Sequence, residues 1–372
     1  MKKLIALAVA ALPMAAMADV TLYGNIEASI ENGKSLAYSG GAKKSTTRID
    51  DTGSLIGFKG SENLGNGLKA IWQVEQGLNI DGTTGADSGN GYGNTWATRK
   101  GYNNTWATRD SFVGLTGNFG TVRLGKLSTY LNSDMEKYDA WIYGAGVNGA
   151  TWTTANTLDG RFDNAIRYDS PNLNGFKFTA AYGFDEKRTT VGNGNRSNQA
   201  MWNLGAGYEN AGYYVDAGYV AYQDTDATGS KDSNYWRLEG GYNANNLLVA
   251  LAYGQSKLYK LYNATGPVNA TSVVNATGAV NATKAKEAAL TVGYTIGALT
   301  PKFTYARVWD SKINDTKIDD GINQYVIGVD YALSKRTTAY TSFGYVKHDN
   351  IIVPGTDERK ERTLAVGVQH KF

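Results

Sequence analysis

The end of the chain alternates between apolar and polar side chains. In RTLAVGVQHKF (362–372), Leu364, Val366, Val368 and Phe372 share one parity, and most of the residues between them are small or polar. The same period runs through DVTLYGNIEASI (19–30) and GLKAIWQVEQ (67–76). A period of two places successive side chains on opposite faces of a β-strand. Each segment has about ten residues, the length that a tilted strand needs to cross a bilayer.

Such runs predict sixteen strands, an even number. Gly is abundant (45 residues) and is interleaved with β-branched and aromatic residues, which favours strands over a disordered chain. The predicted strands lie at about 19–31, 48–62, 67–76, 109–117, 120–126, 163–170, 176–184, 199–209, 212–223, 235–243, 247–258, 286–296, 301–309, 322–332, 337–346 and 361–372.

The connections between these strands alternate strictly between short and long. Short ones carry turn residues, as in ENLGN (62–66) and ENAG (209–212), whereas the long ones are polar and irregular. Short connections at one end of the strands and long connections at the other end are typical of an outer-membrane barrel, which has short periplasmic turns and long external loops. The sequence therefore predicts an all-β fold, a 16-stranded antiparallel transmembrane β-barrel over residues 19–372, with both termini at the periplasmic end.

A secreted β-sandwich or a β-propeller would also show alternation and frequent turns. The chain has no cysteine for disulfides, and its strands show no blade-length repeat, so both folds fit less well. The first residues, MKKLIALAVAALPMAAMADV, have the charged start, apolar run and small-residue cleavage site of a secretory signal peptide, which predicts cleavage after residue 18.

Two repeated phrases fall in predicted long connections. NATGPVNATSVVNATGAVNATKAK (263–286) repeats a hexad, and GYGNTWATRKGYNNTWATRD (91–110) is a near-duplication. Four hexads are too few to stack into a β-helix core, and a bacterial barrel does not meet the machinery that glycosylates Asn-x-Thr in eukaryotes. Insertions in loops cost little closure entropy, so we interpret both phrases as loop variation.

Several blocks of the chain resemble one known family. DVTLYG (19–24), GSLIGFKGSENLGNGLKAIWQVEQ (53–76), IRYDSP (166–171), SKRT (334–337) and the terminal HKF are similar to the neisserial branch of the general bacterial porins. The resemblance covers all sixteen predicted strands and fades in the loops.

This resemblance implies a homotrimer of barrels in the bacterial outer membrane, each with its own water-filled pore. It also implies that the third loop, here 127–162, folds inward and narrows that pore. Phe372 resembles the terminal signal that the outer-membrane assembly machinery reads, and lipopolysaccharide and other outer-membrane lipids are expected partners. Small hydrophilic solutes and ions would pass through by diffusion.

Charged residues with the phase of the polar face are candidates for the pore lining. Their phase argues for the lumen, because a cation facing lipid near the midplane costs about 2–4 kcal/mol. Arg161 comes just before its strand and is added to this set because of its position. The apolar residues with the opposite phase, which would face lipid, are Phe58, Leu68, Trp72, Phe112, Val122, Leu124 and Ile166. The candidate basic ladder is Lys59, Lys69, Arg109, Arg123, Arg161 and Arg167.

The predicted inward loop offers three acids, Asp134, Glu136 and Asp139, opposite the basic ladder. Facing rows of opposite charge would set up a transverse field across the narrow section. Basic residues outnumber acids on the inward phase of the first six predicted strands, which predicts a weak preference for anions.

Alternatives to a general diffusion pore remain. The loops could make the barrel a scaffold or adhesin, and Trp141 and Trp152 in the third loop keep a sugar-selective channel open. A barrel hydrolase would need an external histidine, and His348 in the last long connection is the candidate. We expect no enzyme activity, cofactor or metal site, and the near balance of 35 basic and 34 acidic residues after the signal peptide argues against a nucleic-acid partner.

Overall fold

The part of the chain that the structure describes is built almost wholly from β-strands. The computed structural model describes residues 19–34, 45–51, 53–81, 106–141, 158–186, 198–226, 229–259, 282–349 and 360–372. No helix in these ranges is long and apolar enough to cross a membrane. The elements are β1 (Asp19–Lys34), β2 (Thr46–Asp50), β3 (Leu55–Gly65), β4 (Leu68–Gly77), β5 (Ser111–Gly117), β6 (Gly120–Ser128), α3 (Tyr130–Ser133), β7 (Arg161–Asp169), β8 (Phe176–Gly183), β9 (Met201–Asn210), β10 (Tyr213–Tyr222), β11 (Ser233–Ala244), β12 (Leu247–Leu258), β13 (Thr283–Tyr294), β14 (Leu299–Val308), β15 (Lys312–Ile313), β16 (Thr316–Lys317), β17 (Ile322–Ala332), β18 (Thr337–His348) and β19 (Lys360–Lys371).

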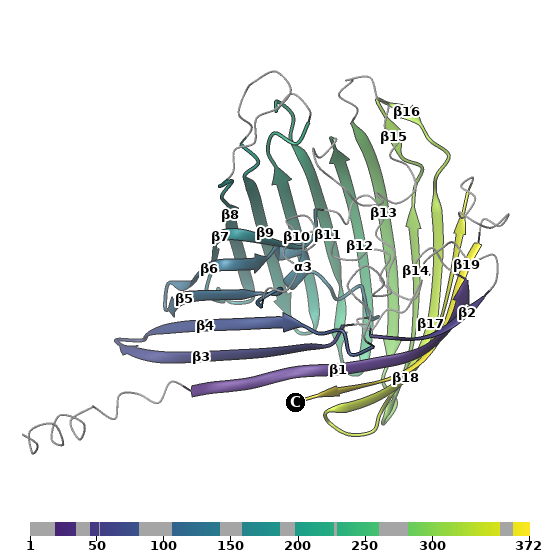
Figure 1. Ribbon diagram of the computed structural model, residues 1–372, viewed down its shortest axis with the longest axis horizontal. Helices are drawn as coiled ribbons and strands as arrows, with labels where there is room; N and C mark the ends of the chain where they lie inside the picture. Colours follow the sequence, from purple (N-terminus) through teal and green to yellow (C-terminus); the bar gives the residue numbers. More distant parts are fainter. Residues whose placement is uncertain are drawn as a thin grey trace, which may run out of the picture.

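These strands close into an antiparallel barrel. Each wall strand pairs with its sequence neighbours, and β1 closes the ring by pairing with β19 on one side and β3 on the other. Figure 1 shows the first strand beside the last ones at this closure. The short hairpin β15–β16 extends one connection, and β2 and β3 together make one wall strand, so that the described wall has sixteen strands.

The sixteen predicted strands are confirmed, with ends shifted by a few residues. The strand predicted at 48–62 is interrupted between Asp50, where β2 ends, and Leu55, where β3 begins. There the Asp51 carboxylate accepts hydrogen bonds from the backbone N–H groups of Gly53 (3.0 Å) and Ser54 (2.8 Å), which replaces strand pairing by a local turn. The predicted signal peptide and residues 91–105 and 263–281 of the two repeated phrases lie outside the described residues.

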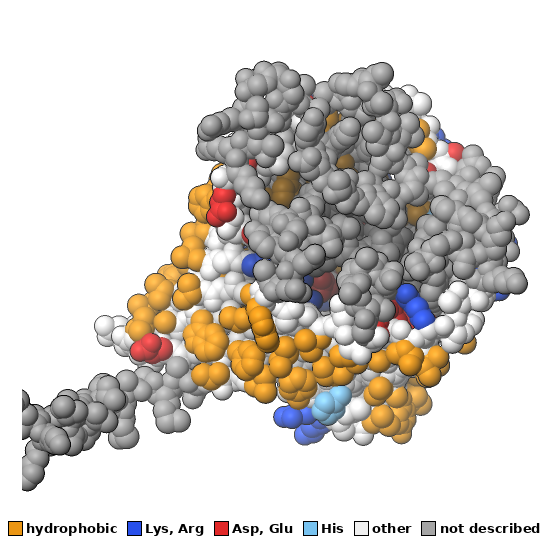
Figure 2. All heavy atoms as spheres, viewed as in Figure 1, with side chains coloured by type: hydrophobic (Ala, Val, Ile, Leu, Met, Phe, Trp, Pro, Cys, Tyr) orange, Lys and Arg blue, Asp and Glu red, His pale blue; other side chains and the backbone are white. Residues whose placement is uncertain are grey.

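The two faces of the wall differ as the alternation predicts. Leu22, Val215 and Leu251 are more than half exposed and lie on the outer face, whereas Glu27, Arg237 and other residues of the opposite parity are buried. Figure 2 shows hydrophobic side chains gathered in a band across this outer face. An apolar band of this kind suits contact with lipid.

The phase prediction for Phe112 is wrong. Phe112 lies opposite Gln73 and Gly125 on the inner face, and the neighbouring Val113 is 58% exposed on the outer face. The prediction counted parity from residue 109, but β5 begins at Ser111, after an irregular segment in which Ala107 has a positive φ of 67°. Regular alternation does not hold through such a segment.

The position predicted for His348 is also wrong. His348 is the last residue of β18 rather than part of an external loop, and its side chain is buried on the inner face. Its Nε2 lies 2.8 Å from the Glu361 carboxylate of β19. An external active-site histidine is therefore not found at this position.

Candidate functional site

The chain that follows β6 packs against the inside of the barrel. Thr129 caps the one-turn helix α3, and its hydroxyl accepts a hydrogen bond from the backbone N–H of Asn132. Tyr130, Leu131 and Met135 are buried in an apolar cluster with residues of the wall strands. We call Thr129–Trp141 the docked segment; residues 142–157 of the predicted third loop lie outside the described residues.

Glycines on the wall make room for this segment. A methyl group at Gly205 of β9 would overlap the Tyr130 ring, and one at Gly218 of β10 would lie 2.8 Å from both Leu131 Cγ and Met135 Sδ. Atoms cannot approach that closely without displacement. The absence of a side chain at these two positions therefore permits the close contact between segment and wall.

Arg237 of β11 is the main polar anchor of the docked segment. Its side chain is 1% exposed, and its Nη2 donates to the carbonyl oxygens of Leu131 (2.5 Å) and Met135. Its Nη1 donates to the Asp159 carboxylate at 2.9 Å. One guanidinium thus satisfies two orphan carbonyls and neutralises a carboxylate, a use that suits the planar fork of arginine.

Sequence reasoning missed Arg237. A usable signal was present, because Tyr235, Arg237 and Glu239 alternate with the outward Trp236 and Leu238 along β11. That parity places the arginine inside, but nothing in the local pattern shows that it binds a segment about one hundred residues earlier in the chain.

Arg167 of β7 joins the predicted basic ladder to a predicted loop acid. Its Nη2 lies 2.8 Å from Asp134, its Nε donates to Asp169 at 2.8 Å, and its Nη1 donates to the Ser133 hydroxyl at 2.8 Å. Arg123 of β6 pairs with the same Asp169 at 2.5 Å. Wall and loop charges therefore meet in direct ion pairs here, rather than facing one another across open water.

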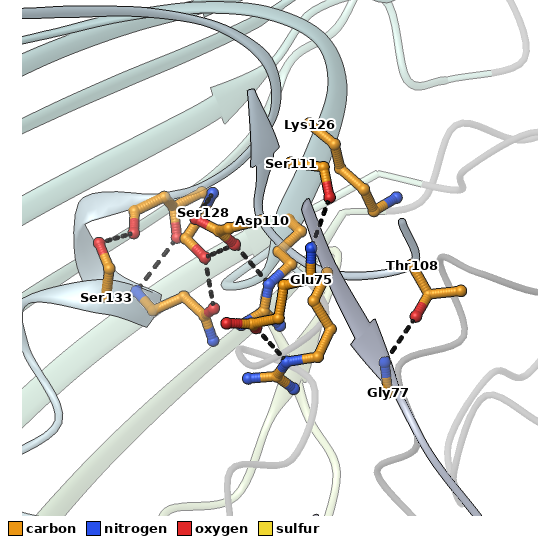
Figure 3. A network of polar contacts seen from close by, with 12 residues as sticks. Glu75, Gly77, Thr108, Asp110, Ser111, Lys126, Ser128 and Ser133 are labelled. Atoms are coloured by element: carbon orange, nitrogen blue, oxygen red, sulfur yellow. Dashed lines mark hydrogen bonds and ion pairs between the residues drawn. The ribbon is translucent and has the colours of Figure 1, made fainter. Parts of the chain in front are cut away.

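Arg109 and Arg161 are also paired. Arg109 Nε lies 2.5 Å from Glu75, which accepts a second hydrogen bond from the Tyr23 hydroxyl at 2.9 Å. Arg161 Nε lies 2.6 Å from Asp110. Figure 3 shows Glu75 and Asp110 in one network of polar contacts near the start of the docked segment.

Asp110 lies at the centre of that network. Ser128 donates to its carboxylate through both the hydroxyl (2.6 Å) and the backbone N–H (3.1 Å). Burial alone would raise the pKa of Asp110, but the Arg161 charge and the hydrogen bonds from Ser128 outweigh it and hold that pKa below its ordinary value. The ionised Asp110 carboxylate therefore holds Ser128, the last residue of β6, in place.

Two members of the predicted basic ladder have no acidic partner within the described residues. Lys59 of β3 and Lys69 of β4 lie on the inner-face parity, opposite Gln73 and Asn63 respectively, and both are exposed. The Lys59 ammonium lies 5.0 Å from the centre of the Tyr23 ring. Their charges are therefore available to whatever occupies the barrel interior.

A third inner lysine, Lys177 of β8, shares a recess with acids. The recess has a volume of about 450 Å³ and lies beside the docked segment; Lys137, Glu209 and Asp216 also line it. Lys137 lies 3.6 Å from Asp216 and 3.7 Å from Glu209. The charges of this recess are close to balanced, unlike those at Lys59 and Lys69.

The other two predicted loop acids differ from Asp134. Asp139 accepts a hydrogen bond from the backbone N–H of Trp141 at 3.0 Å. Glu136 is exposed on the docked segment, and enclosure within the barrel together with the carboxylates of Asp159 and Asp139 raises its pKa to about 8. Glu136 is therefore largely uncharged at neutral pH.

Trp141 is packed rather than presented to the lumen. It is 2% exposed, its Nε1 donates to the Thr304 hydroxyl at 2.7 Å, and the Lys302 ammonium lies 4.6 Å from its ring. Trp152 lies outside the described residues. Trp141 thus cannot stack against a sugar in this arrangement.

A group of three carboxylates lies at one end of the barrel. Asp310, Asp319 and Asp349 have oxygens within 4.8 Å of one another. However, Lys317 pairs with Asp310 at 2.7 Å and Arg307 pairs with Asp349 at 2.7 Å. Two of the three charges are already neutralised, so the group does not resemble a preformed cation site.

Comparison with known families matches residues 4–351 to the model of a family described as Gram-negative porin. Over its whole length the chain is 36% identical to the major outer membrane protein P.IB of Neisseria meningitidis serogroup A, of which 99% is covered. It is 35% identical to the protein of the same name from Neisseria sicca, with the same coverage.

Solved structures show the same architecture. An anion-selective porin from Comamonas acidovorans aligns with a TM-score of 0.71 at 22% identity, covering 95% of this chain and 100% of that one. The trimer form of OmpT from Vibrio cholerae aligns with a TM-score of 0.63 at 16% identity, covering 95% and 99%. At these identities the likeness establishes the barrel fold.

Proposed function

The chain belongs to the Gram-negative porin family and is a general diffusion porin of the outer membrane, and we propose that its pore weakly prefers anions. The family points to a channel rather than an enzyme. Small hydrophilic solutes and ions pass through such a pore without chemistry, so selection depends on the charges and the width of its interior.

The exposed inner lysines carry the proposal on selectivity. Arg109, Arg123 and Arg167 are each matched by a carboxylate, whereas Lys59 and Lys69 have no such partner in the described part of the chain. Unmatched charge acts on passing ions over about a Debye length, roughly 10 Å at 0.1 M salt, while a matched pair acts much less. The net field of β3 and β4 therefore favours anions.

We further propose that the third loop narrows the pore. The docked segment supports this, because Thr129–Trp141 occupies space against β9 to β14 that would otherwise belong to the lumen. In this proposal the described acidic residues of the loop contribute less to the electric field across the pore than the sequence alone implies. Asp134 is bound by Arg167, and Glu136 is mostly protonated at neutral pH.

The assembly is proposed to be a homotrimer, in keeping with the trimer form of the OmpT neighbour. We also propose that Phe372 serves as the assembly signal. Its backbone pairs with Gly24 of β1, with N–H to carbonyl distances of 3.1 Å in both directions, and the residue is 37% exposed. The end of the chain is thus held in the wall while the residue stays partly accessible.

The test of selectivity is the reversal potential of the purified protein in planar bilayers under a KCl gradient. We expect an anion-signed potential, which moves toward zero in the Lys59→Gln/Lys69→Gln variant. The matched control is Lys286→Gln/Lys347→Gln, which removes two exposed cations from the outer face and should leave the potential unchanged.

A cation-signed potential, or no difference between the two variants, would overturn the proposed charge assignment. Absence of channels from folded protein would instead favour the scaffold alternative. A sugar-selective channel is disfavoured at Trp141, whose ring is buried under Lys302. If a linear oligosaccharide blocked the current, the sugar-selective channel would again be supported.

A further inference from the structure

The recess beside the docked segment is large enough to hold a small solute. It lies at the end of the barrel that carries the short connections, because the turns after β7 and β9 contribute Asn172 and Asn210 to its lining. Its volume of about 450 Å³ falls within the range of small-molecule sites, roughly 300–1,000 Å³. A solute that crosses the barrel therefore passes close to this recess at one mouth of the pore.

A glycine lies at the floor of the recess. Gly207 of β9 is directly opposite Lys177 of β8 on one side and Asp216 of β10 on the other. Adjacent strands lie about 4.8 Å apart, so the backbones of the lysine and the aspartate are roughly 10 Å apart, with only the backbone of β9 between them. A methyl group at Gly207 would lie 2.6 Å from the Tyr130 hydroxyl and would overlap the Asp216 carboxylate. The glycine therefore keeps the floor open.

Among the described residues, one side of the recess carries more negative charge than its lysine balances. Lys137 of the docked segment lies 3.6 Å from Asp216 and 3.7 Å from Glu209, and both distances are too long for close hydrogen bonds. The Tyr130 hydroxyl donates to Asp216 at 2.7 Å and holds that carboxylate in place. One ammonium thus faces two carboxylates, and their oxygens can accept hydrogen bonds from a further donor.

The other side of the recess carries a cation. Lys177 is exposed on the inner face, and it forms no ion pair in the part of the chain that the structure describes. Asp134, a third acid of the lining, does not supply a partner, because Arg167 already binds it. Lysine carries its charge at the end of a flexible four-carbon stem, so the Lys177 ammonium can move over the glycine floor. Positive and negative charge therefore lie on opposite sides of one recess.

We propose that the recess binds small zwitterions, and free α-amino acids in particular. The carboxylate of the solute accepts a hydrogen bond from Lys177, and its ammonium donates to Asp216 and Glu209. A simple anion also meets the two carboxylates, and a simple cation also meets Lys177, so a solute that carries both charges is favoured over one that carries a single charge. This proposal rests on the proposed function, because solutes reach the recess only through a water-filled barrel.

The experiment measures the binding of L-alanine to the purified folded protein in detergent by saturation-transfer NMR. Two analogues are compared with it: N-acetyl-L-alanine, which lacks the ammonium, and L-alaninamide, which lacks the carboxylate. We expect both analogues to bind at least about tenfold more weakly than L-alanine, because each loses one charge-assisted hydrogen bond. Equal binding of all three compounds would overturn the proposal.

Two substitutions separate the two ends of the solute. Lys177→Gln should weaken the binding of L-alanine by about tenfold without weakening that of L-alaninamide, which has no carboxylate to bind. Glu209→Gln should weaken the binding of L-alanine but not that of N-acetyl-L-alanine. The matched controls are Lys335→Gln and Glu62→Gln, which change exposed residues outside the recess at the same end of the barrel. Equal loss in the controls, or no loss in either recess variant, would overturn the assignment.

Two further measurements keep the outcomes separate. Lys177 and Glu209 are both exposed, so neither substitution should alter folding, and the gel mobility of the folded form checks this. If a variant does not assemble, the comparison of the three compounds on the wild type decides by itself. A wild-type channel that conducts in planar bilayers but does not prefer L-alanine would overturn the binding site alone. Folded protein that binds L-alanine but does not conduct would contradict the proposed function instead.

Discussion

The inner faces of β3–β4 and of β9–β14 carry out different tasks in the same barrel. The first presents Lys59 and Lys69, which have no carboxylate against them among the described residues. The second combines glycines, buried acids and Arg237, and the docked segment covers it. As far as the described residues go, one wall is left to water and ions, and the other is an interior protein interface. The comparison teaches that inward charge alone does not identify a residue that meets the solute.

The contrast also explains the fate of the predicted transverse field. The prediction of this field assumed that acidic residues of the loop would face basic residues of the wall across water. In the structure, Arg167 and Asp134 are in contact and Arg237 is enclosed by the segment it holds. These charges fasten the loop, so the field of the open wall depends on fewer groups than the sequence suggests.

The largest expected effect is on the docked wall. Arg237→Ala leaves Asp159 and two carbonyls without their buried partner, which should destabilise the folded protein by about 3–5 kcal/mol and release the docked segment. Urea unfolding followed by gel mobility measures the first effect, and larger, noisier single-channel currents report the second. Arg362→Ala on the exposed outer face is the control. Wild-type currents and stability in Arg237→Ala would refute the anchoring role.

A smaller effect is expected from steric pressure on the same wall. Gly205→Ala should cost about 1–3 kcal/mol, because the new methyl group overlaps the Tyr130 ring. In a Tyr130→Ala background the same change should cost little. Gly293→Ala, where an added methyl group meets nothing closer than 3.4 Å, is the matched control on the inner face. A penalty that is unchanged by Tyr130→Ala would show that the contact is not its cause.

The open wall should respond very differently to substitution. Lys59→Gln/Lys69→Gln is expected to change the unfolding free energy by no more than about 0.5 kcal/mol per site, because neither side chain is buried and neither pairs with a carboxylate within the ranges that the structure describes. The same urea titration measures it beside Arg237→Ala. A large loss of stability would mean that these lysines are structural, and the distinction between the two walls would fail.

The smallest effect concerns Glu136, which lies on the docked segment but is exposed. Its pKa of about 8 means that it gains a negative charge as the pH rises from 6 to 9. The anion preference should therefore decline over that interval. An ordinary glutamate ionises near pH 4.5, so between pH 4.5 and about 8 the docked Glu136 keeps its proton while an undocked one loses it. The free energy that favours docking therefore decreases as the pH rises over this interval. Reversal potentials at both pH values test this, and Glu136→Gln should remove the pH dependence.

The sequence by itself determined the barrel. Alternation with period two, about ten residues per strand and connections of alternating length are local properties, so the sixteen strands and their two faces could be predicted within a few residues. The parity of Lys59, Lys69, Arg123 and Arg167 was local as well, and the structure places these four residues on the inner face. Where regular pairing broke down, before Ser111 and at 51–54, the same reasoning failed.

Tertiary structure alone decided which of these charges meet. The partners of Arg167 and Arg237 in the docked segment lie 33 and 106 residues away in the chain. Such pairs form only after the ring has closed and the segment has docked, and no local period records them. Whether a lysine meets water or a carboxylate, and whether Trp141 meets solute or Thr304, follows from that long-range packing.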